Sequence, residues 1–290
     1  MIVDAQVHPF AANSPEWPWA SDAPDAVHLP EVTGDQMVKA MDEAGVDRAI
    51  VVSPVRVYLF DSGYAEKVYS DHPDRFRLVA PVDPKSADVE QRIEAWAATP
   101  GAVGVRILFE SRNNLPPDHP GVLAAVKAAA AADLTVNIQC WERLHLMDGL
   151  ARRFPDARLV LDHLGMTQHT EPPPPDDPFA QIEQVLALAQ YPNVTVKVTG
   201  ACTVSHRPFP YDDLWEPVGR VIDTFGVDRC MWGTDWTRAT HFLTYEQGLS
   251  AFRDHWPMSE TDKAAFLGET ALRIYTWDKF SANGSAADRR

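Results

Sequence analysis

Short apolar runs alternate with amphipathic stretches along most of the chain. Eight runs rich in Val, Ile and Leu predict buried strands, and they lie at 2–7, 48–53, 77–82, 103–108, 135–139, 158–162, 194–199 and 229–233. Strands that alternate with helices favour a parallel sheet. Eight such units predict an α/β fold, a (β/α)8 barrel of the TIM type.

Apolar residues at helical spacing fill the stretches between these runs. They predict helices at 33–44, 62–71, 88–98, 120–132, 144–153, 179–189, 213–224, 245–255 and 260–275. Gly45 follows the first as a helix stop, and Pro73 and Pro155 follow two others. We expect one domain over residues 1–280 and a disordered polar tail at 281–290.

Three predicted connections are longer than the usual links of α/β units. They are 9–30, 166–177 and 201–211, and each follows a strand. In a barrel, the loops that follow strands form the C-terminal mouth, where barrel enzymes hold their active sites. We therefore expect these three loops to wall an active site.

The acidic composition narrows the classes of partner. A net charge of −15 argues against nucleic acid and anionic membranes, which are bound by basic patches. The three cysteines are widely spaced, and no apolar run reaches the length of a membrane span. The sequence predicts a cytoplasmic protein that acts on a small molecule, with homo-oligomerisation left open.

Polar side chains stand at the ends of three predicted strands. Gln6 and His8 close the first, His163 follows the sixth and Asp235 follows the eighth. Because side chains alternate between the two faces of a strand, Asp4, Gln6 and His8 are expected to share one face. We assign Asp4 an orienting role through backbone hydrogen bonds, and we expect the other four in one pocket.

The motifs around these residues resemble the amidohydrolase superfamily (amidohydrolase-related, family 2). They are Asp-x-Gln-x-His at 4–8, Asp-His-Leu-Gly at 162–165, Val-Lys-Val-Thr-Gly at 196–200 and Gly-Thr-Asp-Trp at 233–236. The resemblance is greatest to the branch of 2-pyrone-4,6-dicarboxylate lactonase and sugar-acid lactonases. It implies a hydrolase that opens a lactone or related ester of a small carboxylic acid.

The resemblance also bears on metal binding. The family usually has Asp-x-His-x-His on the first strand, and here Gln6 replaces the first histidine. A neutral amide is a weak ligand for zinc compared with imidazole. We expect that no cofactor is required; the alternative is a single Zn or Mn ion held by His8, His163 and Asp235.

In the metal-free mechanism that the resemblance implies, Asp235 is the general base that activates water. His8, His163 and Gln6 would polarise the carbonyl group. Other roles remain open from the residues alone, because Asp235 could cap a helix and His163 could be a core histidine. The remaining histidines are expected at the surface; they are His28, His72, His119, His145, His169, His241 and His255.

Basic and aromatic residues supply candidates for substrate binding. Arg106 interrupts an apolar strand, so it must pair with a carboxylate, either of the protein or of the substrate. Arg207 and Arg238 lie on predicted mouth segments, Lys197 alternates with Thr199 on its strand, and Trp141 follows another. Lys197 could equally have a partner inside the protein.

Two other functions compete with the lactonase. One is a metal-dependent non-oxidative decarboxylase of the same superfamily, since Gln6 has the shape of the glutamate found there. The other is a binding homologue without catalysis. A mouth with no cavity would favour this last function.

Overall fold

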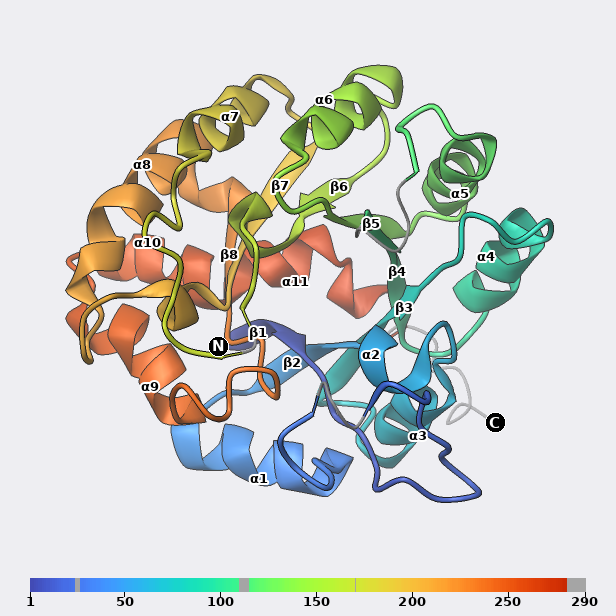
Figure 1. The fold of residues 1–290 in the computed structure, drawn as a ribbon, viewed down its shortest axis with the longest axis horizontal. Helices are drawn as coiled ribbons and strands as arrows, with labels where there is room; N and C mark the ends of the chain where they lie inside the picture. Colours follow the sequence, from blue (N-terminus) through green and yellow to red (C-terminus); the bar gives the residue numbers. More distant parts are fainter. Residues whose placement is uncertain (24–26, 110–114, 170, 281–290) are drawn as a thin grey trace, which may run out of the picture.

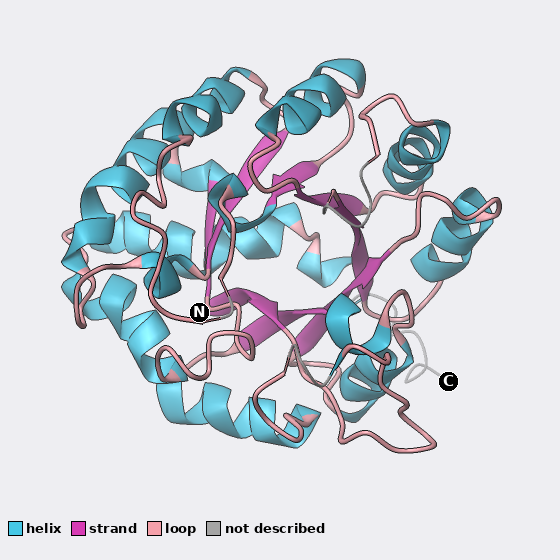
Figure 2. Ribbon diagram, in the orientation of Figure 1, coloured by secondary structure: helices cyan, strands magenta, loops and turns pink. Residues whose placement is uncertain are grey.

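The computed structural model describes residues 1–23, 27–109, 115–169 and 171–280, and it contains a parallel eight-stranded barrel. The strands follow each other in sequence order: β1 Val3–Val7, β2 Arg48–Val52, β3 Phe76–Pro81, β4 Ala102–Leu108, β5 Thr135–Gln139, β6 Leu159–Leu161, β7 Val194–Thr199 and β8 Cys230–Gly233. Figure 2 shows them as an inner ring surrounded by helices. The predicted fold is confirmed, and each predicted strand end lies within one residue of the observed end. The predicted tail at 281–290 is outside the described residues.

Backbone contacts between the first and last strands close the ring. Val7 forms a parallel bridge with Trp236, and the His8 amide donates to the Trp236 carbonyl oxygen at 2.7 Å. The Asp235 amide donates to the Gln6 carbonyl oxygen at 3.1 Å. Closure therefore brings the two ends of the predicted site together, although they are more than two hundred residues apart.

Helices surround the barrel (Figure 1). They are α1 Gly34–Ala44, α2 Val55–Tyr58, α3 Gly63–Asp71, α4 Val89–Ala97, α5 Pro120–Ala131, α6 Leu144–Arg153, α7 Ile182–Ala187, α8 Trp215–Phe225, α9 Tyr245–Ser250, α10 Glu260–Ala264 and α11 Thr270–Ile274. Two of them, α2 and α11, lie at the mouth of the barrel and across its far end, respectively. The predicted helix 260–275 is interrupted by a π-helical turn between α10 and α11, and α9 ends in another. The short α2 was not predicted, because its four residues are too few for a helical pattern.

Apolar side chains fill the barrel below its mouth. Residues from several strands, such as Ala5, Ile50 and Val160, form one buried cluster with Tyr275 and Trp277. In Figure 1, α11 crosses the barrel behind the ring of strands, and it contributes Ala271 and Ile274 to this cluster. The interior is thus a packed core that closes the barrel beneath the polar groups of the mouth.

A bulge in β1 corrects one prediction. The pairing register between β1 and β2 shifts between Asp4 and Val7, so the strict alternation of faces is broken there. Asp4 accepts hydrogen bonds from the backbone of Gln6 at 3.0 Å and from the hydroxyl of Tyr245 on the outer helix α9 at 3.0 Å. Asp4 therefore faces outward, while Gln6 and His8 face the mouth.

Asp4 also ties β1 to β8. It accepts hydrogen bonds from the Thr234 amide at 3.0 Å and from the Thr234 hydroxyl at 2.5 Å. Gly233 permits this approach, because a Cβ atom there would lie 2.9 Å from an Asp4 oxygen. These contacts agree with the predicted orienting role of Asp4.

Within the described part of the chain, no helix has the length and apolar character needed to cross a membrane. Cys140, Cys202 and Cys230 are all buried and free.

Candidate active site

A pocket opens at the C-terminal mouth of the barrel. Its volume is about 740 Å³ when the open entrance is included, and His8, His163 and Asp235 line its floor. His163 and Asp235 each follow a strand end and adopt the left-handed backbone conformation, with φ of 56° and 59°. Such conformations are unfavourable for residues other than glycine and are concentrated at functional sites.

The Gln6 amide lies buried directly beneath this floor. Its Oε1 accepts a hydrogen bond from Lys197 Nζ at 3.0 Å. An ammonium group can only donate, so this contact fixes which way the amide points. Gln6 Nε2 consequently lies 3.2 Å from His8 Nε2, 3.2 Å from His163 Nε2 and 3.1 Å from Asp235 Oδ1.

This orientation decides how well the site fits a divalent ion. The three candidate ligand atoms surround an N–H₂ group, which presents protons where an ion would need to be. Lys197 adds a positive charge directly behind the amide. His8, His163 and Asp235 therefore do not fit a metal ion while Gln6 keeps this position.

His8 bridges a backbone carbonyl and the candidate base. Its Nδ1 lies 2.6 Å from the Val52 carbonyl oxygen, which can only accept, so Nδ1 carries a proton. Its Nε2 lies 3.0 Å from Asp235 Oδ1. This second contact is a hydrogen bond when Nε2 is also protonated, and His8 is then a cation beside a carboxylate.

His163 is held as the neutral imidazole. Arg106 Nη2 lies 3.1 Å from His163 Nε2 and can only donate, so Nε2 accepts and the proton is on Nδ1. Nδ1 contacts the Thr199 hydroxyl at 2.9 Å. Burial lowers the pKa of His163 to about 4. In this state His163 has no proton on Nε2 to donate to a carbonyl oxygen.

Asp235 is buried and ionised. Burial alone would raise its pKa, but the neighbouring groups, above all the Arg238 guanidinium, outweigh that effect and hold the pKa well below its usual range. One carboxylate oxygen faces His8 and Gln6, and the other pairs with the Arg238 guanidinium. The geometry thus provides a charged carboxylate at the pocket floor.

A buried ion cluster supports the floor from below. Arg106 Nε lies 2.7 Å from Asp162 Oδ2, and Lys197 Nζ lies 3.3 Å from Asp162 Oδ1. Burial opposes ionisation of Asp162, but Lys197 and Arg106 outweigh it and lower the pKa to about 2. Burial lowers the pKa of Lys197 to about 8, which leaves it charged at pH 7. Arg106 thus meets a carboxylate of the protein, which is the structural alternative; a contact between Arg106 and a substrate stays a prediction.

Of the three other basic residues predicted to bind substrate, only one lines the pocket. Lys197 is fully buried and does not line the pocket, so its alternative, an internal partner, is the one observed. Arg207 is exposed, pairs with Asp212 at 3.1 Å and does not line the pocket, which corrects its predicted place. Arg238 lines the pocket while bonded to Asp235.

Two pocket residues carry buried polar atoms with no partner among the described residues. They are Trp141, whose Nε1 has no acceptor, and Gln168, whose Nε2 has none. A buried donor without an acceptor costs free energy, so these two atoms carry an unsatisfied polar cost beside the pocket. Trp141 was a predicted binding residue, and Gln168 was not.

Sequence reasoning also missed Arg56 and Asp162. Arg56 lies on the short helix α2, lines the pocket and forms no ion pair with any described residue. No sequence pattern marks α2, so no signal could have found Arg56. Asp162 had a signal, because it stands beside His163 at a strand end. The histidines predicted at the surface are all at least partly exposed, as expected.

Comparisons with known proteins show the family and agree with the fold. The family model described as Amidohydrolase matches residues 3–277. L-fucono-1,5-lactonase of Burkholderia ambifaria is 29% identical over 98% of this chain and 98% of its own length. The 4-sulfomuconolactone hydrolase of Hydrogenophaga intermedia is 24% identical over 73% of this chain and 68% of its own length.

A solved structure shares the fold. An amidohydrolase from Burkholderia multivorans with bound HEPES has a TM-score of 0.80 and 20% identity, covering 96% of this chain and 99% of that one. A second structure of that protein contains bound zinc, and amidohydrolases often bind a metal. The motif order, the barrel and the family match agree, so the chain belongs to the amidohydrolase family and is a hydrolase.

Proposed function

We propose that this enzyme opens the lactone ring of a small carboxylic acid without a required metal ion. The observation that carries the proposal is the Gln6 amide, whose N–H₂ group lies among His8, His163 and Asp235. The relatives named as lactonases support the reaction class. The open pocket speaks against a homologue without catalysis.

In the proposed mechanism, Asp235 accepts a proton from the attacking water as the water oxygen bonds to the lactone carbonyl carbon. The developing oxyanion receives hydrogen bonds from His8 Nε2 and Arg106, which both line the pocket. The bond to the ring oxygen then breaks, and that oxygen takes a proton from His8 or from Asp235. The product is an open-chain hydroxy acid.

His163 and Gln6 act through other groups in this mechanism. His163 accepts a hydrogen bond from Arg106 and so aims the guanidinium, a different role from the one expected. Gln6 is buried and does not line the pocket, so it positions His8 and Asp235 rather than touching the substrate. Lys197 holds Gln6 in place.

Arginines give the pocket a local positive charge in an otherwise acidic protein. Arg56, Arg106 and Arg238 line it, and Asp235 is the one carboxylate among its lining residues in the described parts of the chain. A guanidinium matches a carboxylate bidentately. We therefore propose a lactone that carries a carboxylate, and a cytoplasmic location with the buried free cysteines as support.

Arg56→Ala tests the substrate charge. We expect KM for a carboxylate-bearing lactone to rise about tenfold, because a partly exposed charge-assisted contact is lost, while kcat stays nearly unchanged. The measurement is steady-state kinetics with that lactone and with its neutral methyl ester. Arg207→Ala, on the exposed surface, is the matched control. Equal losses on both substrates would remove Arg56 from carboxylate recognition.

Gln6→His tests the metal-free site. It restores an imidazole among His8, His163 and Asp235, so zinc bound per chain should rise by about one equivalent over wild type. Elemental analysis after dialysis against zinc measures the difference. Wild-type enzyme treated with chelator should keep its lactonase activity. Loss of activity that added zinc restores, or release of CO₂ instead of ring opening, would favour the metal-dependent decarboxylase.

A further inference from the structure

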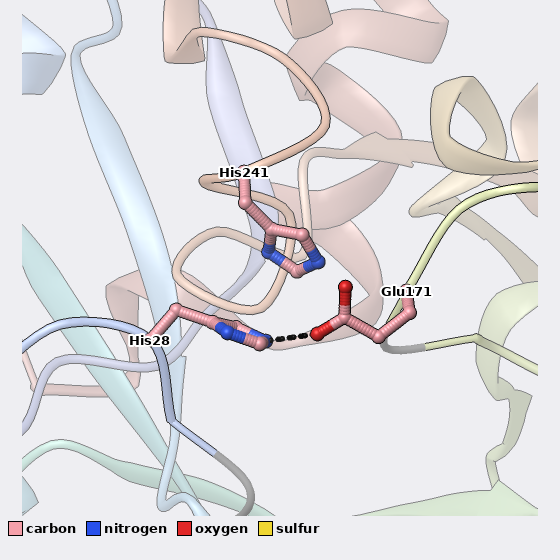
Figure 3. A group of neighbouring side chains, drawn as sticks. All are labelled: His28, Glu171 and His241. Atoms are coloured by element: carbon pink, nitrogen blue, oxygen red, sulfur yellow. Dashed lines mark ion pairs between the residues drawn. The ribbon is translucent and has the colours of Figure 1, made fainter.

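A group of metal-ligating side chains lies at the rim of the pocket, away from its floor. His28, Glu171 and His241 come from the loops that follow β1, β6 and β8, and Figure 3 shows both imidazoles beside the Glu171 carboxylate. We propose that these three residues form a separate binding site for a divalent transition-metal ion of the zinc type. The mechanism proposed above makes no use of any of the three.

The distances suit a small ion after a modest adjustment. One ligand atom from each residue lies within 4.8 Å of the other two, and His28 Nε2 lies 3.6 Å from Glu171 Oε1. Two ligands of a tetrahedral zinc ion lie about 3.4 Å apart, given bonds of about 2.1 Å. His28 Nε2 and Glu171 Oε1 are thus already near the separation that they would have on a zinc ion. The third ligand atom, from His241, needs only a small movement of a side chain on a loop.

The ligand types select the class of metal. Two imidazole nitrogens and one carboxylate oxygen suit zinc and its neighbours in the transition series, whereas calcium and magnesium prefer oxygen ligands alone. Among the described residues, this is the one group of three such side chains whose ligand atoms all lie within 4.8 Å of each other. The Gln6 amide keeps the floor residues from forming another.

The three rim residues lie at the protein surface, where an ion can reach them. All three residues are exposed, so an ion can enter from solvent and water can complete its coordination. The ring centroids of His28 and His241 are 3.9 Å apart, which already brings the loops after β1 and β8 into contact. An ion would convert this contact into coordinate bonds.

The rim site is connected to the pocket through its neighbours. His28 itself lines the pocket, and so does Thr240, the residue before His241. An ion held by all three ligands would link three mouth loops along one side of the entrance. We expect it to raise the thermal stability of the protein and to alter KM more than kcat, because it fixes the entrance and leaves the floor unchanged.

Zinc titration of the full chain tests the proposal. After removal of metals by chelation, wild type should bind about one zinc ion per chain by calorimetry, and cobalt(II) should give visible absorption bands of an imidazole-ligated ion. His28→Asn, His241→Asn and Glu171→Gln should each weaken zinc binding at least about tenfold. His145→Asn, an exposed histidine on α6, is the matched control.

The outcomes separate this site from the floor. Zinc binding that is equal in wild type and in all three rim variants would overturn the rim site. Zinc binding lost in Asp235→Asn but kept in the rim variants would overturn both the rim site and the metal-free floor. Activity of the wild-type enzyme that survives chelation supports the metal-free lactonase, whichever way the zinc titration falls.

Discussion

Asp235→Asn is expected to lower kcat for lactone hydrolysis by about a thousandfold, within the range that a general base contributes. Asparagine keeps the shape of the side chain but cannot take a proton from water. The low pKa of Asp235 keeps the wild-type carboxylate charged throughout the neutral range. The asparagine amide does not titrate there, so no change of pH should restore the variant. Steady-state kinetics measure the loss, and binding of the lactone to the variant should persist.

The control for this variant is Asp223→Asn, which removes an exposed carboxylate on α8. It should leave kcat unchanged. Because Arg238 pairs with Asp235, the thermal unfolding of Asp235→Asn must be measured beside its kinetics. A folded Asp235→Asn enzyme with full activity would remove Asp235 from the mechanism.

Asp162→Asn is expected to destabilise the protein by about 3–5 kcal/mol, the usual cost of removing one partner from a buried ion cluster. Arg106 is 5% exposed and Lys197 is 0% exposed, so both cations would remain in the core without their carboxylate. Urea unfolding monitored by circular dichroism measures the change in the free energy of unfolding. Asp156→Asn, on the exposed surface, should change it little.

A second substitution checks the cause. Adding Lys197→Met to Asp162→Asn removes one of the two uncompensated cations, so part of the lost stability should return. An effect of the two substitutions that is simply additive would mean that Lys197 and Asp162 do not interact, despite the 3.3 Å between their charged atoms. This double-mutant cycle therefore measures the interaction energy between Asp162 and Lys197, the residue that holds Gln6 in place.

The structure first differs from the sequence-based prediction at the bulge in β1. Regular alternation predicted that Asp4, Gln6 and His8 share a face, and one inserted residue directs Asp4 outward to Tyr245 instead. A bulge depends on pairing with β2 and on closure against β8, which lie far away in the sequence. Periodicity within a single strand cannot report it.

For the predicted binding residues, too, the sequence indicated the need for a partner and the structure decided which partner it is. Arg106 could be predicted to need a carboxylate, because a charge within an apolar strand has no other stable state. That the carboxylate is Asp162, and that Lys197 shares it, depends on the neighbourhood of β4, β6 and β7. Arg56 reaches the pocket from a four-residue helix, and Arg207 turns away to Asp212.

The sequence by itself determined the barrel, the order of its strands and the residues at their ends. These follow from short-range patterns: apolar runs that must be buried, helical spacing between them, and polar groups where a strand stops. The tertiary structure alone decided which atoms meet. The direction of the Gln6 amide depends on Lys197, the tautomer of His163 depends on Arg106, and the rim group depends on three separate loops. Hydrogen bonds act over about 3 Å, so contacts between distant segments exist only once the chain has folded.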